Sequence, residues 1–475
     1  ILIWALLEMA TPKSLNPSYF LRRGVEKWLG KIFIPSMTFL SIGLVPVASY
    51  YIGQAASTDK LVNAAGGAAG IVSLVSGVAS ALYSYYVFVR NMVPGFAARI
   101  AATVGSLFYL YGTFVLAYWL SIAIAETPFL ISGSVPTVKV IAWCLAAVAF
   151  ALALYGNINF VGLHRYYRDR LMEAFMPTDA SVNAMRTDRS PVADGLSLVD
   201  LRSASFKAPD GSAVSPTPYP LINTNVILVK DDNPKYATRG GANFLISPLF
   251  IGSAATGWED TGAFIDRFGP MTLATAMAAS GAAASASAGY IGTGITMNPI
   301  VAAVMSLLNI RLGLWVGNPA STSNPMIRRI PTFFNPALWA GVLGRGHRRH
   351  NRFIELTDGG HFENLAMYEL VRRKLGLILV VDGEADPKIS FASLVSARNR
   401  IEQDFGAQLD FFEGQGPEPL VMHAGRNYPV GAKFAQSPFI VGQLTYSDTT
   451  RGTFIYIKSN VTPALDFSIA GYLAS

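Results

Sequence analysis

Four long stretches without a charged side chain constrain this 475-residue chain more than any other feature. They are 32–52, 61–89, 100–125 and 140–163. A helix needs about 20 residues to cross the hydrocarbon core of a bilayer, and each stretch is at least that long. The sequence therefore predicts four transmembrane helices within 32–163, preceded by a basic, amphipathic N-terminal segment over 1–31.

The composition agrees with that expectation. Hydrophobic residues make up 51% of the chain and charged residues 14%, and the mean hydropathy is +0.36. A typical soluble domain has about 25% charged residues, so these values favour a chain that lies partly in lipid. The single cysteine, Cys144, excludes a disulfide framework and a thiolate metal site. No nucleic-acid motif accompanies the net charge of +7, which instead indicates affinity for anionic lipid surfaces.

The distribution of basic residues predicts the topology of these spans. Basic residues on the side where the spans begin and end are Lys13, Arg22, Arg23, Lys27, Lys31, Arg90, Arg99, Arg165, Arg168 and Arg170. The opposite loops carry only Lys60 and Lys139. By the positive-inside rule, the region 164–475 is expected to be cytoplasmic. The absence of charge inside the spans disfavours a transporter.

The segment 356–387 holds the best candidate for catalysis. Asp358 stands at the end of an expected strand and is followed by Gly359 and Gly360, which allow a tight turn that leaves the carboxylate uncovered. The spacing of apolar residues over 362–375 predicts a helix. The run LGLILVVD after it is typical of a strand buried on both faces.

Other elements are expected around this segment. The run 164–175 predicts a helix with Arg165, Arg168 and Arg170 directed at lipid phosphates, or a solvated basic helix end. Residues 221–229 predict a strand, and 271–285 predict a helix of very small residues that packs closely on a sheet. The basic stretch 345–352 is expected either to hold anionic headgroups or to form a solvated loop.

DGGHFEN, YELVRRK and VVDGEADP together resemble the C-terminal catalytic segment of bacterial patatin-like phospholipases, in a branch embedded in the membrane. Supporting runs occur in the order of that family within 164–387. The resemblance implies a three-layer α/β/α domain over 164–475, a Ser-Asp dyad and hydrolysis of acyl esters in lipids, of the phospholipase A or lysophospholipase type. It makes Asp358 the dyad aspartate. No cofactor or metal is expected, and the implied location is the bacterial inner membrane as a multi-pass protein.

The chemistry of that role is general. A serine hydroxyl is a poor nucleophile at neutral pH, so a carboxylate within hydrogen-bond reach must take its proton as it attacks. The alternative role for Asp358 is to cap the following helix. For His361 and Glu363, hydrogen bonding at a helix start is favoured over metal binding, because the cysteine partners of a zinc deaminase motif are missing.

The sequence departs from the family at the nucleophile. No G-x-S-x-G motif occurs in the 475 residues, and the resemblance places this elbow and the oxyanion loop upstream of the spans, before Ile1. Because the chain begins with Ile1 rather than methionine and its last residues, GYLAS, resemble an interruption, residues are expected to be missing at both ends. Ser280 is the rival nucleophile within the chain, with a packing role as its alternative.

Two functions remain open from the sequence. One is a lipid acyl hydrolase whose partners are membrane phospholipids. The other is a non-catalytic patatin-like membrane subunit of a larger protein assembly. No nucleic-acid partner is expected.

Overall fold

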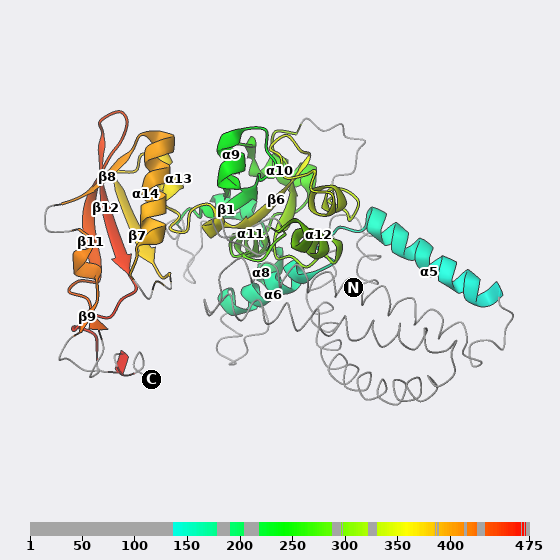
Figure 1. The fold of residues 1–475 in the computed structure, drawn as a ribbon, viewed down its shortest axis with the longest axis horizontal. Coiled ribbons are helices and arrows are strands. Elements are labelled where there is room, and N and C mark those ends of the chain that lie inside the picture. Colours follow the sequence, from blue (N-terminus) through cyan, green and yellow to red (C-terminus); the bar gives the residue numbers. More distant parts are fainter. Residues whose placement is uncertain are drawn as a thin grey trace, which may run out of the picture. The chain divides into compact units, whose positions relative to one another are not determined.

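The computed structural model describes residues 136–177, 191–203, 218–286, 296, 298–321, 330–384, 386, 389–412, 416–424, 433–466, 468, 469 and 471. Contacts divide the chain into two compact units, Ile1–Asp358 and Gly359–Ser475 (Figure 1). The boundary falls directly after the candidate aspartate, inside the region 164–475. The segment 1–31 and the first three expected spans lie outside the described residues.

The first unit is built on an antiparallel six-stranded sheet in the order β4-β3-β2-β1-β6-β5. Its strands are β1 (Ile222–Ile227), β2 (Gly241–Ile246), β3 (Phe250–Ser253), β4 (Gly257–Asp260), β5 (Leu314–Gly317) and β6 (Phe353–Asp358). The helix α10 (Thr261–Phe268) packs on β3, β4 and also β5, although β4 and β5 are opposite edges of the sheet. The sheet therefore curls into a half-barrel around this helix. Gly317 permits the close approach, because a Cβ there would lie 2.1 Å from the Phe268 ring.

The first unit also contains helices, only some of which pack on the sheet. Besides α10 they are α5 (Pro136–Tyr155), α6 (Leu163–Phe175), α8 (Pro191–Gly195), α9 (Pro234–Arg239), α11 (Leu273–Ser280), α12 (Pro299–Leu307), the 3₁₀-helix η2 (Leu198–Ser203) and the π-helix η4 (Leu338–Val342). Side-chain caps define several starts: Asp260 accepts from the Ala263 N–H, and Thr272 from the Thr275 N–H. Figure 1 shows α11 between the sheet and α6, in agreement with its contacts.

The core of the first unit forms where α10 and α11 meet the sheet. Val226, Phe244 and Leu356 from the strands pack with Phe264 of α10 and Ala279 of α11, all almost fully buried. The alanines of α11 bring its backbone close to the sheet, as the sequence predicted. The expected helix over 164–175 and strand over 221–229 are confirmed as α6 and β1, and the helix expected over 271–285 is present but shorter, as α11.

A buried arginine holds α6, α8 and α11 together. The Arg168 guanidinium, 2% exposed, donates to the Asp169 and Asp194 carboxylates at 2.8 and 2.7 Å. It also donates to the hydroxyls of Thr272 and Thr275, each at 3.0 Å. The positive charge of Arg168 is thereby paired and its N–H groups have acceptors, as the burial of an arginine requires.

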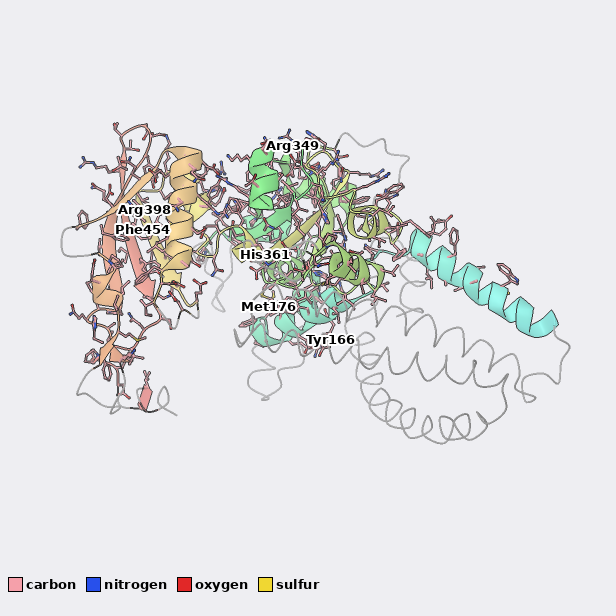
Figure 2. All side chains as sticks on the ribbon, viewed as in Figure 1. Tyr166, Met176, Arg349, His361, Arg398 and Phe454 are labelled. Atoms are coloured by element: carbon pink, nitrogen blue, oxygen red, sulfur yellow. The ribbon has the colours of Figure 1, made fainter. Side chains whose placement is uncertain are left out.

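The second unit has its own sheet in the order β7-β12-β11-β8. Its strands are β7 (Leu377–Asp382), β8 (Gln408–Phe411), β11 (Phe439–Thr445) and β12 (Arg451–Lys458), with a short pair β9 (His423–Ala424) and β10 (Lys433–Phe434). Its helices are η5 (Gly359–His361), α13 (Met367–Arg372), α14 (Ala392–Phe405) and η6 (Glu418–Leu420). Only β7 and β12 pair in parallel among these strands. Side chains of α13 and α14 pack with Phe454 and Tyr456 to form the core, and Figure 2 marks Phe454 on the sheet and Arg398 on α14.

The expected three-layer α/β/α domain is wrong. The described strands form a curled antiparallel sheet in one unit and a separate four-stranded sheet in the other. The run LILVVD suggested a strand buried on both faces, but in β7 only alternate residues are buried, while Leu377, Leu379 and Val381 are 61%, 55% and 71% exposed. A continuous apolar run does not by itself determine which faces of a strand are covered.

The expected transmembrane region and its multi-pass inner-membrane location are also corrected. Among the residues that the structure describes, none of the helices combines the length and apolarity needed to cross a membrane. The fourth expected span, 140–163, is not one helix, because α5 ends at Tyr155 and α6 begins at Leu163. Between them the Asn159 carboxamide binds the backbone N–H and carbonyl of Trp315 on the edge strand β5, at 3.0 and 2.7 Å. The stretch 140–163 has no charged residue, but it contains polar residues such as Asn159 in the break between the two helices.

Replacing Arg168 with leucine should destabilise the protein by about 3–5 kcal/mol, since Asp169 and Asp194 would keep buried charges without their closest partner. Urea unfolding followed by circular dichroism measures the change. The control is Arg348→Leu, which removes a long, exposed ion pair with Asp232 at 3.6 Å and should cost less than about 1 kcal/mol. Equal, small losses in both variants would contradict the role assigned to Arg168.

Candidate active site

Asp358 is the last residue of β6 and lies half-exposed at the strand end. On one side β6 pairs with β1, where Thr224 is opposite Asp358. On the other side β5 pairs only as far as Leu356, and the Asp358 N–H instead donates to the Ala282 carbonyl at 3.2 Å. The backbone of the aspartate is thus fixed from two sides, while its side chain stays at the margin of the core.

The two glycines after Asp358 have a different role from the one expected. Gly359 and Gly360 belong to the 3₁₀-helix η5, and Gly359 is buried. The strand therefore passes directly into a helical turn. This geometry leaves Asp358 at the junction, as the sequence predicted.

The loop after α11 lies beside Asp358, and a tyrosine of α6 is hydrogen-bonded to that loop. The Tyr167 hydroxyl donates to the Gly281 carbonyl at 2.8 Å. A Cβ at Gly281 would lie 2.6 Å from this hydroxyl, so any larger residue would displace the Tyr167 side chain. Burial raises the pKa of Tyr167, and the negative charge of Asp358 raises it further. The phenol therefore stays neutral beside the carboxylate.

A histidine one turn earlier anchors α6 to the same region. His164 is buried, and its ring Nδ1–H donates to the Leu312 carbonyl. Burial lowers the pKa of His164 to about 3, and the positive charges of Arg311, Arg168 and Arg165 lower it as well, against the opposing effect of the bond to Leu312. The imidazole is consequently neutral at physiological pH.

The structure gives the rival nucleophile another role. The Ser280 hydroxyl donates to the Asn223 carbonyl at 2.7 Å, which fits the packing alternative. Ser285 is fully buried and accepts from the Gly313 N–H at 2.7 Å. The imidazole of His347 contacts Glu355 at 3.0 Å, and both side chains are also buried.

The basic residues expected to reach lipid phosphates are instead used within the fold. Arg168 is buried, and Arg170 pairs with Glu173 at 2.6 Å. In the stretch 345–352, the Arg349 N–H donates to the Asp231 carboxylate at 2.8 Å, and its guanidinium lies over the Tyr236 ring of α9. Figure 2 shows Arg349 close to α9. The solvated-loop alternative is closer to this arrangement than a headgroup site.

Glu363 takes the helix-start role that the sequence favoured. Its carboxylate accepts from the backbone N–H groups of Leu365 and Tyr368, the latter at 3.0 Å, at the beginning of α13. Burial raises the pKa of Glu363, while these hydrogen bonds oppose the shift. In the described part of the chain, no group of three or more His, Cys, Asp or Glu side chains could hold a metal ion.

Sequence reasoning predicted Asp358 at a strand end but did not single out Tyr167 and His164. Both lie in the run HRYYRDR, where the arginines and tyrosines suggested a membrane interface. Tyr167 bonds to Gly281 and His164 to Leu312, each more than 100 residues away in the sequence. No sequence motif contains both members of either pair. No signal in a single sequence connects such positions.

Comparison with models of protein families and with curated proteins finds no match. The resemblance to patatin-like phospholipases therefore stays a prediction.

His164→Gln should weaken the pH dependence of stability on the acidic side. The folded-state pKa of about 3 lies below the ordinary 6.5, so the unfolded chain takes up a proton first and stability falls as pH drops through this window. Between pH 7 and 4.5 the variant should lose roughly 2.5 kcal/mol less than the wild type.

Urea unfolding at the two pH values measures this difference, with His350→Gln, a change at an exposed histidine, as the matched control. Identical pH dependence in the wild type and His164→Gln would show that His164 is not buried in its neutral form.

Proposed function

We propose that this chain carries the general base of a lipid acyl ester hydrolase of the phospholipase A or lysophospholipase type. Asp358 is the base of a Ser-Asp dyad, and the nucleophilic serine is supplied by sequence outside residues 1–475. The observation that supports this most directly is the placement of Asp358: a partly buried residue at a strand end, paired with β1 on one side and bonded to the Ala282 carbonyl on the other. The segment around it is also the one that resembles the catalytic segment of patatin-like phospholipases.

The proposed chemistry requires a carboxylate with a fixed position and an accessible oxygen. As the serine oxygen attacks the ester carbonyl, Asp358 accepts the hydroxyl proton; it later returns this proton to the leaving alcohol. A base on a strand end whose backbone N–H is bonded loses little entropy when the substrate binds, which favours a reactive geometry. The oxyanion that forms needs N–H donors, and these belong to the same outside sequence as the serine.

Tyr167 supports the proposed base indirectly. Its hydroxyl fixes Gly281, the residue before Ala282, and the Ala282 carbonyl accepts from the Asp358 N–H. The Tyr167 hydroxyl proton is used on the Gly281 carbonyl. Tyr167 is therefore a positioning residue in this proposal.

The proposed substrates are acyl esters of lipids, and the chemistry needs no cofactor. A carboxylate base and a serine nucleophile suffice for acyl transfer to water. The partners in this proposal are phospholipids or lysophospholipids. Nucleic acid has no part in it.

Asp358→Asn should lower kcat for a short-chain nitrophenyl ester and for lysophospholipid by about 100-fold or more, the typical contribution of a general base. Asparagine keeps the shape of the side chain but cannot accept the proton. The assay uses the full-length protein, with circular dichroism to confirm that the variant is folded. Asp232→Asn, at an exposed aspartate of the same unit, is the control and should retain the wild-type rate. Hydrolysis by Asp358→Asn at the wild-type rate would refute the assignment.

A further inference from the structure

The strand β7 forms one edge of the four-stranded sheet in the second unit. It pairs in parallel with β12 on its inner side, and no strand in the described part of the chain pairs with its outer side. Backbone groups along an outer side of this kind can pair with a further strand. Leu377, Leu379 and Val381 alternate along β7 and are 61%, 55% and 71% exposed. The edge therefore combines a side open to pairing with an uncovered row of aliphatic side chains.

The features that usually protect an edge strand are missing from β7. Charged side chains or prolines on an edge prevent pairing with other chains. β7 has no proline, and its one charged residue, Asp382, is 2% exposed and accepts from Lys458 at 2.8 Å. The opposite edge strand, β8, carries the exposed Asp410. Of the two edges of this sheet, β7 is therefore the one suited to pairing.

The aliphatic row of β7 continues onto the neighbouring strand. Leu379 is opposite Ile455 of β12, and Val381 is opposite Ile457, and both isoleucines are half-buried on the same face. Contiguous apolar patches on a protein surface mark interaction sites. A strand added beside β7 with aliphatic residues in the same positions would gain cross-strand contacts with this row.

The charges that flank β7 have opposite signs at its two ends. The residues are Arg372, Arg373 and Lys374 before the strand, all exposed, and Glu384 and Asp386 after it. Both arginines contact the one carboxylate of Glu369, so together these three groups keep a positive charge. A second copy of β7 in the antiparallel direction brings the basic end of each copy to the acidic end of the other, whereas a parallel copy brings like charges together. The flanks are therefore complementary to an antiparallel copy of the same segment.

We propose that β7 pairs with β7 of a second copy of this chain, antiparallel and about a two-fold axis at Leu379. The two four-stranded sheets then form one continuous sheet. In this register Leu379 is opposite the same residue of the second copy, and Leu377 is opposite Val381. The two-fold axis is perpendicular to the sheet, so the aliphatic rows of both copies lie on the same face. The proposal does not rest on the hydrolase function.

Disulfide cross-linking of the full-length protein with Cys144→Ser tests the register. Leu379→Cys should give a covalent dimer on mild oxidation, because directly opposed residues of antiparallel strands have Cα atoms about 4.5–5.5 Å apart, within the range of a disulfide. Leu377→Cys, on the same strand and face, is the matched control: its two copies lie about 13 Å apart along the strands and should not cross-link. Absence of the Leu379→Cys dimer, or equal cross-linking of the two variants, would refute the proposed pairing.

Sedimentation velocity of the full-length protein tests the association itself. The wild type should sediment as a dimer at micromolar concentration. Leu379→Lys places two like charges opposite each other and should raise the dimer Kd at least tenfold. Val395→Lys, at an aliphatic residue of α14 that is 52% exposed, should leave the Kd unchanged. A monomeric wild type, or equal effects of the two changes, would overturn the proposal. Because sedimentation of the wild type needs no variant, the proposal stays testable if a variant does not fold.

Discussion

The buried guanidinium of Arg168 is the interaction on which the first unit depends. It is buried, and its N–H groups donate hydrogen bonds to two carboxylates and two threonine hydroxyls on α6, α8 and α11. A buried ion pair is weak evidence for net stability, because desolvation offsets much of the attraction. Its geometric effect is clearer: any rotation of α6 about its axis would leave a charge unpaired. The orientation of α6 is therefore fixed.

That orientation places two other side chains of α6. Tyr167 reaches the Gly281 carbonyl, and through the neighbouring Ala282 carbonyl the loop holds the backbone of Asp358. His164 reaches the Leu312 carbonyl. One helix thus bonds both to the loop beside the proposed base and to the segment that contains Leu312. Burial lowers the pKa of His164 and keeps its imidazole neutral, and the positive charges of Arg311, Arg168 and Arg165 act in the same direction.

Local patterns predicted local structure well. The runs 164–175, 221–229 and 271–285 each predicted an element that the structure contains as α6, β1 and, over a shorter range, α11. Asp358 was expected at a strand end and is found there. These predictions succeed because they depend on neighbours in the sequence.

Predictions that depend on long-range contacts were wrong. The absence of charge in 140–163 suggested one helix, but Asn159 is used to satisfy the edge of β5. The apolar run of β7 suggested a strand with both faces covered, and only one face is. Arg168 suggested contact with lipid phosphates, yet its partners Asp194 and Thr272 lie 26 and 104 residues away. The sequence around a charged residue does not show whether a residue far away in the chain will pair with its charge.

The central claim is that Asp358 activates a serine that lies outside residues 1–475. A fluorophosphonate probe reacts only with an activated serine, so labelling of the full-length protein followed by peptide mapping tests this claim most directly. The account predicts one labelled serine outside 1–475 and loss of its labelling in Asp358→Asn. Labelling that is independent of Asp358, or labelling at Ser280, would contradict it.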